Sequence, residues 1–134
     1  MEEHQCAFSA PLIAEEFGCV HAKPVTRRTG PGVVCVSAQS QARCAELFQR
    51  LKDAALPAFG VEDDLLSMPH SVLQKIQYGG LLGLQRLLHR QDAAVRNVNA
   101  LVGDVVAHYS KLDAVPLADI IRDMTGYKLR GRRR

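Results

Sequence analysis

Four cysteines lie in the first third of this 134-residue chain, and the remaining residues contain none. Four cysteines placed at random would all fall within the first 44 positions only about one time in a hundred, so the crowding indicates a shared chemical role. Thiolates bind metal ions and iron–sulfur clusters. We therefore expect one metal centre, whose predicted ligands are Cys6, Cys19, Cys35 and Cys44.

The spacing of these cysteines is C-x12-C-x15-C-x8-C, and it contains no C-x2-C pair. Structural zinc sites usually take two ligands from one tight turn, which this spacing lacks. An iron–sulfur cluster tolerates wider dispersal, because its inorganic core separates the bound thiolates. The spacing favours an iron–sulfur cluster of unknown type, with zinc as the alternative. Redox disulfides and unrelated buried thiols stay open, since Cys44 shares a helical stripe with leucines.

Two histidines are alternative metal ligands. His21 follows Cys19 as C-x-H, which is half of the Rieske pattern, but no histidine stands at the corresponding position after Cys35. His4 could replace one sulfur in a Cys3His zinc site. Arg27 and Arg28 precede a turn, and we expect one of them near the cluster, where its charge would offset that of the thiolates.

The elements that must position these residues follow from local patterns. Pro11 and Gly18 mark the start and the end of a short helix. The β-prone stretches 19–28 and 33–36 flank the turn formers of residues 29–32, which predicts a hairpin. Because proline cannot donate a backbone hydrogen bond, Pro24 restricts the first arm to a sheet edge or a bulge.

Helical periodicity begins at Ser40 and predicts helices that end near Pro57, near Leu88, near Leu112 and at Met124. Their starts are expected at residue 40, near Pro69, and at residues 93 and 117, with a connector at residues 61–68. Glycines interrupt the second of these helices. They predict either a kink or the close approach of a neighbouring backbone, and they are Gly79, Gly80 and Gly83.

These motifs give the chain a family likeness. Its residues are the four cysteines, Arg27-Arg28-x-Gly30 before Cys35, and Pro69-His-Ser71 leading to Gly79-Gly80-Leu-Leu-Gly83. The chain resembles small, poorly described bacterial proteins that carry four dispersed cysteines before a helical body and are thought to bind iron–sulfur clusters. The resemblance implies a cluster and assigns no catalytic residue.

Composition bounds the fold. The hydrophobic content of 47% and the charged content of 23% are ordinary for a globular domain, and the aromatic content of 5% indicates an aliphatic core. We expect a mainly α, small α+β fold with four or five helices. The single domain would span 1–126, with a cysteine-bearing layer at 1–44 and a helical body at 45–126, followed by a basic tail at 127–134.

Charge and hydropathy limit the classes of function that the chain could have. The chain shows neither a membrane-spanning run nor a signal peptide, which predicts a cytoplasmic protein whose thiols are reduced. Six of the 17 Lys and Arg residues lie within 122–134, so the positive charge is concentrated at the C-terminal end and the rest of the chain is not basic. Nucleic-acid binding is therefore expected only weakly, and only through the tail. The tail residues that could bind a polyanion are Lys128, Arg130, Arg132, Arg133 and Arg134.

No hydrolytic or phosphate-binding motif is present in the sequence, so an enzyme is not predicted. The sequence predicts an iron–sulfur accessory protein for electron transfer or redox sensing, which works with a redox partner protein. The alternative is an interaction module that is not an enzyme, in which zinc or buried cysteines are structural. That module would bind a protein or a polyanion through a helical face or the tail. The oligomeric state is not set by these patterns.

Overall fold

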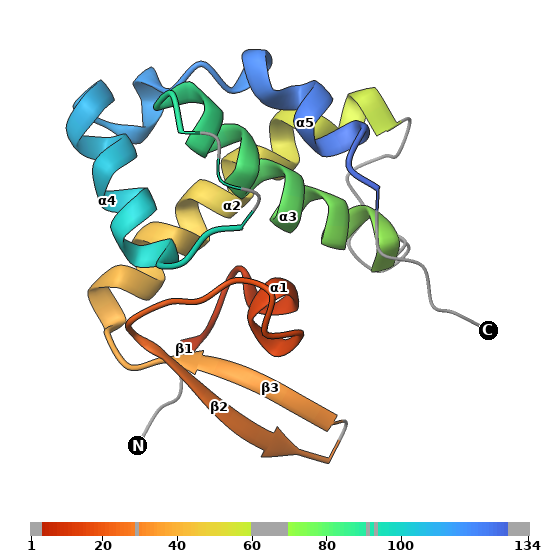
Figure 1. Ribbon diagram of the computed structural model, residues 1–134, viewed down its shortest axis with the longest axis vertical. Coiled ribbons are helices and arrows are strands. Elements are labelled where there is room, and N and C mark those ends of the chain that lie inside the picture. The colour runs from red at the N-terminus through yellow and green to blue at the C-terminus, as the bar shows by residue number, and fades with distance from the viewer. Residues whose placement is uncertain (1–3, 29, 60–69, 91, 93, 129–134) are drawn as a thin grey trace.

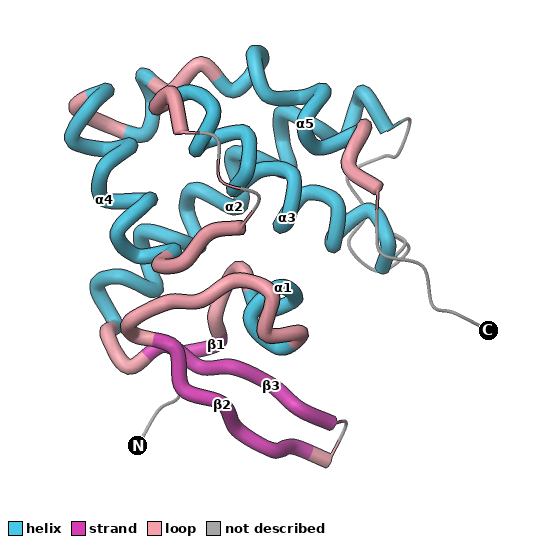
Figure 2. The backbone as a smooth tube through the Cα atoms, viewed as in Figure 1, coloured by secondary structure: helices cyan, strands magenta, loops and turns pink. Residues whose placement is uncertain are grey.

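A small sheet and one short helix form the N-terminal third of the molecule, and the rest is helical (Figures 1 and 2). The computed structural model describes residues 4–28, 30–59, 70–90, 92 and 94–128. The predicted fold class is confirmed, because the helices pack together on one side of a three-stranded antiparallel sheet. The elements are β1 (His4–Gln5), α1 (Ser9–Ile13), β2 (Ala22–Arg27), β3 (Gly30–Cys35), α2 (Ala38–Phe59), α3 (His70–Leu87), α4 (Val98–Tyr109) and α5 (Ile121–Thr125).

The sheet has the strand order β1-β3-β2. The predicted hairpin is confirmed, and Pro24 lies on the edge strand β2, as its missing donor requires. The turn is tighter than expected, because Arg27 already pairs with Gly30. The turn formers from Gly30 onward therefore belong to β3. The sequence did not predict β1, because two residues are too few to show an alternating pattern.

Helix α2 is longer than predicted at both ends. It begins after Ser37, whose Oγ accepts a hydrogen bond from the backbone N–H of Ser40 at 3.2 Å. It continues through Pro57 to Phe59. Proline has no backbone N–H to donate within a helix. Because Pro57 lies in the last turn of α2, this costs only a single hydrogen bond. The buried face of α2 carries Leu47, Leu51 and Ala55, as the periodicity predicted.

The later helices are shorter than predicted. Asn97 caps α4, and its side chain accepts the N–H of Ala100 at 3.4 Å, so Val95 is buried but precedes the helix. The single helix expected at 117–124 is a 3-10 turn, Leu117–Ile120, followed by α5. Position 93, the predicted start of the α4 segment, lies outside the described residues, as do the connector at 61–68 and positions 129–134.

The glycines of α3 are explained by close packing against the C-terminal elements. A Cβ on Gly79 would stand 2.6 Å from the Cα of Met124 in α5, and one on Gly83 would stand 2.7 Å from the Cβ of Ile120. Real Cβ atoms do not approach so closely, so only glycine permits this contact. The expectation of a close backbone approach is confirmed.

None of the helices in the described part of the chain has the length and apolar character that a bilayer crossing requires.

Candidate metal centre

Three of the four cysteines lie at one corner of the sheet, where β1 and β3 end. His4 pairs with Cys35 across the sheet, and Ala22 pairs with Cys35 from the other side. Cys6 follows β1, and its backbone N–H donates to the carbonyl of Val33 at 3.1 Å. Since alternate residues of a strand share one face, the side chains of Cys6 and Cys35 lie on the face that Val33 buries against the helices.

Cys19 is held at this corner by the loop that contains it. The carbonyl of Cys19 accepts the N–H of Ala22 at 3.1 Å, next to the position that pairs with Cys35. Gly18 exchanges backbone hydrogen bonds with the segment before α4, donating to Val95 at 2.9 Å and accepting from Val98 at 2.8 Å. The loop therefore bridges the sheet and the start of α4.

Gly18 has a different role from the one that the sequence suggested. Helix α1 ends at Ile13, so Gly18 does not terminate it. A Cβ at Gly18 would stand 2.8 Å from the carbonyl oxygen of Arg96, which excludes any other residue unless the loop shifts. Glycine at this position lets the loop that bears Cys19 lie directly against the chain that leads into α4.

Cys44 comes to the corner from a fourth element, helix α2, which packs on β1 and β3 (Figure 1). Its side chain is buried in the same apolar core that Cys6 and Cys19 contact. Cys35 is tied to the start of α2, because its Sγ donates to the carbonyl oxygen of Ser37 at 3.2 Å. The four predicted ligands thus converge from four separate segments, and all four are free thiols.

The thiols are close enough to influence one another electrostatically. Burial raises the pKa of Cys6 to about 11, with further increases from the neighbouring Cys19 and Cys35. Burial likewise raises the pKa of Cys44 to about 12, and each of the other three cysteines adds to the shift. Bringing thiolates together in an apolar environment is costly without a cation. Both groups are therefore neutral near pH 7 unless a metal displaces their protons.

In the described part of the chain, no three His, Cys, Asp or Glu side chains are arranged so that they could hold one metal ion. The four thiols lie within electrostatic reach of one another, and their side chains would have to turn toward a bound metal or cluster. For Cys35 this movement would break its hydrogen bond to Ser37. The donor set of four thiols suits an iron–sulfur cluster or zinc.

The two alternative histidine ligands are placed differently. His4 pairs directly with Cys35, and cross-strand partners put their side chains on the same face of the sheet. His21 lies just before β2, and its carbonyl accepts the N–H of Val36 at 2.9 Å. Of the two histidines, His4 is therefore the better placed to replace a cysteine as a ligand, because it is the direct cross-strand partner of Cys35.

The structure does not bring Arg27 and Arg28 to the cysteines. Arg27 pairs with Gly30 at the turn end of the hairpin, whereas Cys35 pairs with Ala22 at the opposite end. Arg27 lies five residue steps along the extended strand from Ala22, which corresponds to about 17 Å. The expectation that one of these two arginines offsets the thiolate charge fails, because an antiparallel pairing puts residues near the turn far from the strand ends.

A different arginine stands beside the site. Arg43 precedes Cys44 on α2, and its positive charge acts to lower the pKa of that thiol against the larger effect of burial. Its Nη2 donates to the side-chain oxygen of Asn99 at 3.0 Å. Sequence reasoning missed Arg43, although its position next to Cys44 on a predicted helix was a usable signal.

The apolar residues that flank the cysteines in sequence are not all buried. Phe8 and Val34 are fully or nearly fully buried, but Val20 and Val36 are 66% and 64% exposed. Val36 follows Cys35 and therefore points to the other face of its strand. Two large apolar side chains thus stand in solvent, each next to a cysteine.

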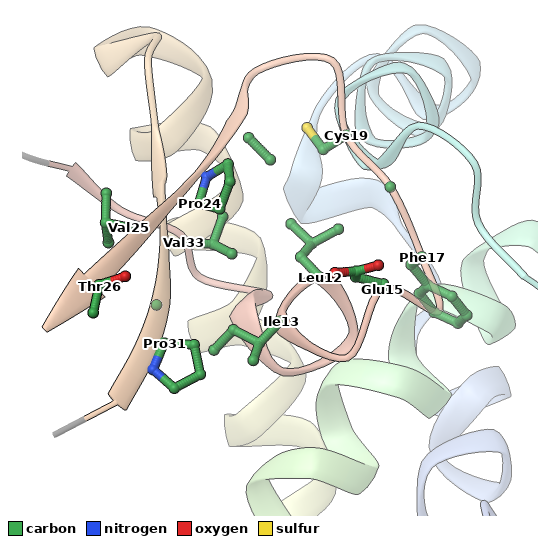
Figure 3. A pocket seen from close by; sticks show the side chains of 13 residues that line it. Leu12, Ile13, Glu15, Phe17, Cys19, Pro24, Val25, Thr26, Pro31 and Val33 are labelled. Atoms are coloured by element: carbon green, nitrogen blue, oxygen red, sulfur yellow. The ribbon is translucent and has the colours of Figure 1, made fainter.

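A cleft of about 720 Å³ lies between α1 and the hairpin, and Cys19 is at one end of it (Figure 3). Its walls are mainly apolar, with Leu12 and Ile13 from α1 facing Pro31 and Val33 from β3. Figure 3 shows Cys19 at the end away from Ile13 and Pro31. The cleft gives solvent access to one side of the cysteine corner.

Of the tail residues that could bind a polyanion, Lys128 is exposed, and Arg130, Arg132, Arg133 and Arg134 lie outside the described residues. Comparison of the chain with protein-family models, with curated proteins and with solved structures found no match.

Proposed function

We propose that Cys6, Cys19, Cys35 and Cys44 hold an iron–sulfur cluster, and that the protein serves electron transfer or redox sensing as an accessory protein. The observation that carries this proposal is the convergence of all four thiols of the chain on one corner of the fold. Buried cysteines that only fill a core have no need to gather in this way.

The separate origin of the ligands supports a cluster over a single zinc ion. Each cysteine comes from a different segment, namely the end of β1, the loop before β2, the end of β3 and helix α2. A structural zinc ion usually draws two ligands from one tight turn. An iron–sulfur core is larger, so thiolates from separate elements can each reach it.

The surroundings suit exchange of electrons with a partner protein. The exposed Val20 and Val36 flank Cys19 and Cys35, and apolar side chains of this kind are common in the centre of protein interfaces. A partner that covered them would lie within a residue of two cluster ligands. We place this function in the cytoplasm, whose reducing conditions keep thiols available as ligands.

The deciding experiment is purification of the full chain without oxygen, followed by metal and sulfide analysis. We expect a brown protein with broad visible absorbance and stoichiometric iron and acid-labile sulfide. A colourless protein with one equivalent of zinc would replace the cluster by a structural metal site. A colourless protein without metal would return the cysteines to the core and refute both.

Alanine variants of the single cysteines test the ligand set. We expect each of the four variants to lose most of its iron, because removal of one ligand breaks a four-point site. His21→Ala is the matched control and should keep its iron. If Cys44→Ala alone kept full metal content, Cys44 would be a core residue, and His4→Ala should then lose the metal.

If Cys44 is not a metal ligand, the effect of Cys44→Ala on the free energy of unfolding can be predicted from other core substitutions. Deleting a buried sulfur resembles other small core deletions and should lower the free energy of unfolding by about 1–2 kcal/mol. Loss of a metal ligand should cost more, because the metal would connect the sheet to α2. The comparison of metal-loaded and chelated protein separates these two contributions.

A further inference from the structure

One wall of the cleft beside α1 is the inner face of the hairpin, and it is mainly apolar. Pro24 pairs with Val33, and Thr26 pairs with Pro31, so these four side chains lie on one face of the two strands. All four line the cleft. Proline and valine side chains carry no hydrogen-bonding group, so this wall offers a ligand apolar contact and a single hydroxyl, that of Thr26.

The opposite wall comes from the end of α1 and the turn that follows it (Figure 3). Leu12 and Ile13 both line the cleft, but Ile13 keeps 37% of its surface exposed. A bound apolar group would remove such surface from water, which is favourable. The cleft volume of about 720 Å³ lies within the range of about 300–1,000 Å³ that is usual for sites of small organic ligands.

Glu15 brings the one charge found in the described lining of the cleft. Figure 3 shows its carboxylate next to Leu12, on the α1 side. This carboxylate forms no hydrogen bond or ion pair with any residue that the structure describes. The cleft is therefore an apolar site that contains a negative charge without a protein partner.

The backbone at Glu15 is held in a conformation that favours glycine. Its φ of 61° lies in the left-handed region, which residues other than glycine, asparagine and aspartate rarely adopt. The turn is fixed by two hydrogen bonds, from the N–H of Glu15 to the carbonyl of Leu12 at 3.1 Å and from the N–H of Glu16 to that of Pro11 at 3.0 Å. Strained residues of this kind gather at ligand sites. A charged residue thus stands where glycine would be less strained, which supports a role for its charge.

We propose that this cleft binds a small organic amine. The apolar body of the ligand packs against Leu12, Ile13 and Val33, and its ammonium group pairs with the carboxylate of Glu15. The charge decides the class of ligand, because the same carboxylate repels an apolar anion of equal size. The inference goes beyond the proposed function and does not require a cluster, since the groups that bind the amine are not thiols.

The test compares three probes of similar shape by isothermal titration calorimetry, with the anaerobically purified full chain at neutral pH and low salt. The probes are naphthylmethylamine, which is cationic, naphthylmethanol, which is neutral, and naphthylacetate, which is anionic. We expect the affinity to fall in this order. Because Glu15 is exposed, the amine should bind about 2- to 5-fold more tightly than the alcohol, and added salt should reduce this preference. Equal affinities, or tightest binding of the anion, would overturn the proposal.

Two carboxylate variants locate the charge that selects the amine. Glu15→Gln should lose the preference for the amine and keep the wild-type affinity for the alcohol. Glu16→Gln is the matched control, because the carboxylate of Glu16 accepts the hydroxyl of Tyr78 and is not part of the described lining. This control should keep the preference. An equal loss in both variants would show that net charge and not Glu15 selects the amine, which contradicts the proposal.

Two tryptophan variants locate the cleft. Thr26→Trp puts a large side chain on the cleft face of β2 and should abolish binding of all three probes. Lys23→Trp makes the same change on the opposite face of the strand and should bind like the wild type. Unchanged binding in Thr26→Trp with a wild-type circular dichroism spectrum would refute the cleft as the site. Wild-type protein that binds none of the probes would refute it as well, whereas iron and sulfide analysis judges the proposed function separately.

Discussion

Single residues decide whether the thiols of the corner carry protons. Cys44 lies in the second turn of α2, near the positive end of the helix, which favours a thiolate. Burial dominates instead and raises the pKa of Cys44 to about 12. The influence of a helix terminus is confined to about its first turn, and an apolar core disfavours charge more strongly.

This residue environment predicts how stability depends on pH in the protein without metal. The pKa of Cys6 rises from 9.0 to about 11 on folding, and that of Cys44 from 9.0 to about 12. Below pH 9 both thiols are protonated in the folded and the unfolded chain, so their contribution to stability is complete. Above pH 9 these two thiols lose their protons in the unfolded chain before they do so in the folded protein. The free energy of unfolding should therefore fall as the pH rises toward 11 or 12.

The measurement is denaturant unfolding of chelated, reduced protein at several pH values between about 8 and 11. Lysine and tyrosine also titrate in this range, so wild type must be compared with Cys44→Ala. The variant lacks the thiol with the largest shift and should show the shallower decline. Parallel curves for the two proteins would contradict a buried, neutral Cys44.

At the scale of elements, three glycines determine how α3 meets its neighbours. Gly79 and Gly83 admit α5 and the turn before it, while a Cβ on Gly80 would meet the flexible end of Leu51 at 2.9 Å. An ion pair fixes the same interface, since Arg86 Nη2 lies 2.8 Å from Asp123 Oδ2. The C-terminal segment is therefore packed on α3 through backbone contact and charge together.

This packing predicts opposite effects for two glycine substitutions inside helices. Gly79→Ala should lower the free energy of unfolding by about 3 kcal/mol, because the new methyl group meets the backbone of α5, which cannot give way locally. Gly103→Ala in α4 is the matched control. Its nearest neighbours are 3.8 Å away, and it should gain up to about 1 kcal/mol from better helix propensity.

Chemical denaturation at constant m value measures both changes. Equal stabilities for Gly79→Ala and the wild type would show that α5 does not approach α3 as closely as described. Destabilisation by Gly103→Ala would show that the space beside Arg43 is already filled.

At the scale of the whole molecule, the cysteine corner joins the sheet to the helical body. Phe8, after β1, is fully buried and meets Phe48 of α2 edge to face, with ring centroids 5.6 Å apart. Helix α1 is tied to α3, because the N–H of Ala10 donates to Gln77 Oε1 at 2.8 Å. The sheet and the helices thus share one core, and a cluster at the corner would add a covalent connection between them.

The C-terminal end gives a prediction for the molecule as a whole. Tyr127 stacks on the buried Tyr78 with centroids 5.1 Å apart, whereas Lys128 is exposed. Deletion of residues 128–134 should leave the free energy of unfolding nearly unchanged, because no described core contact is lost. Deletion of 127–134 should cost about 0.5–1.5 kcal/mol more through the lost aromatic pair. Thermal melts of the two truncations check this, and a loss of cooperative melting in the shorter deletion would contradict it.

The sequence by itself determined those properties that depend on residue type and local period. The hairpin, the edge position of Pro24 and the buried stripe of α2 follow from proline chemistry and from periodicity, and the structure confirms each. The crowding of the cysteines also predicted that they share one region. Element boundaries were less accurate, because caps such as Asn97 depend on single hydrogen bonds.

Only the tertiary structure decided which groups surround the cysteines. Arg27 and Arg28 precede Cys35 closely in sequence, but the hairpin turn sends them to its far end. Arg43, Asn99 and the loop at Gly18 come together through the packing of α2 and α4 against the sheet. Strand register and helix packing join residues that are many positions apart, and local periodicity holds no information about such pairs.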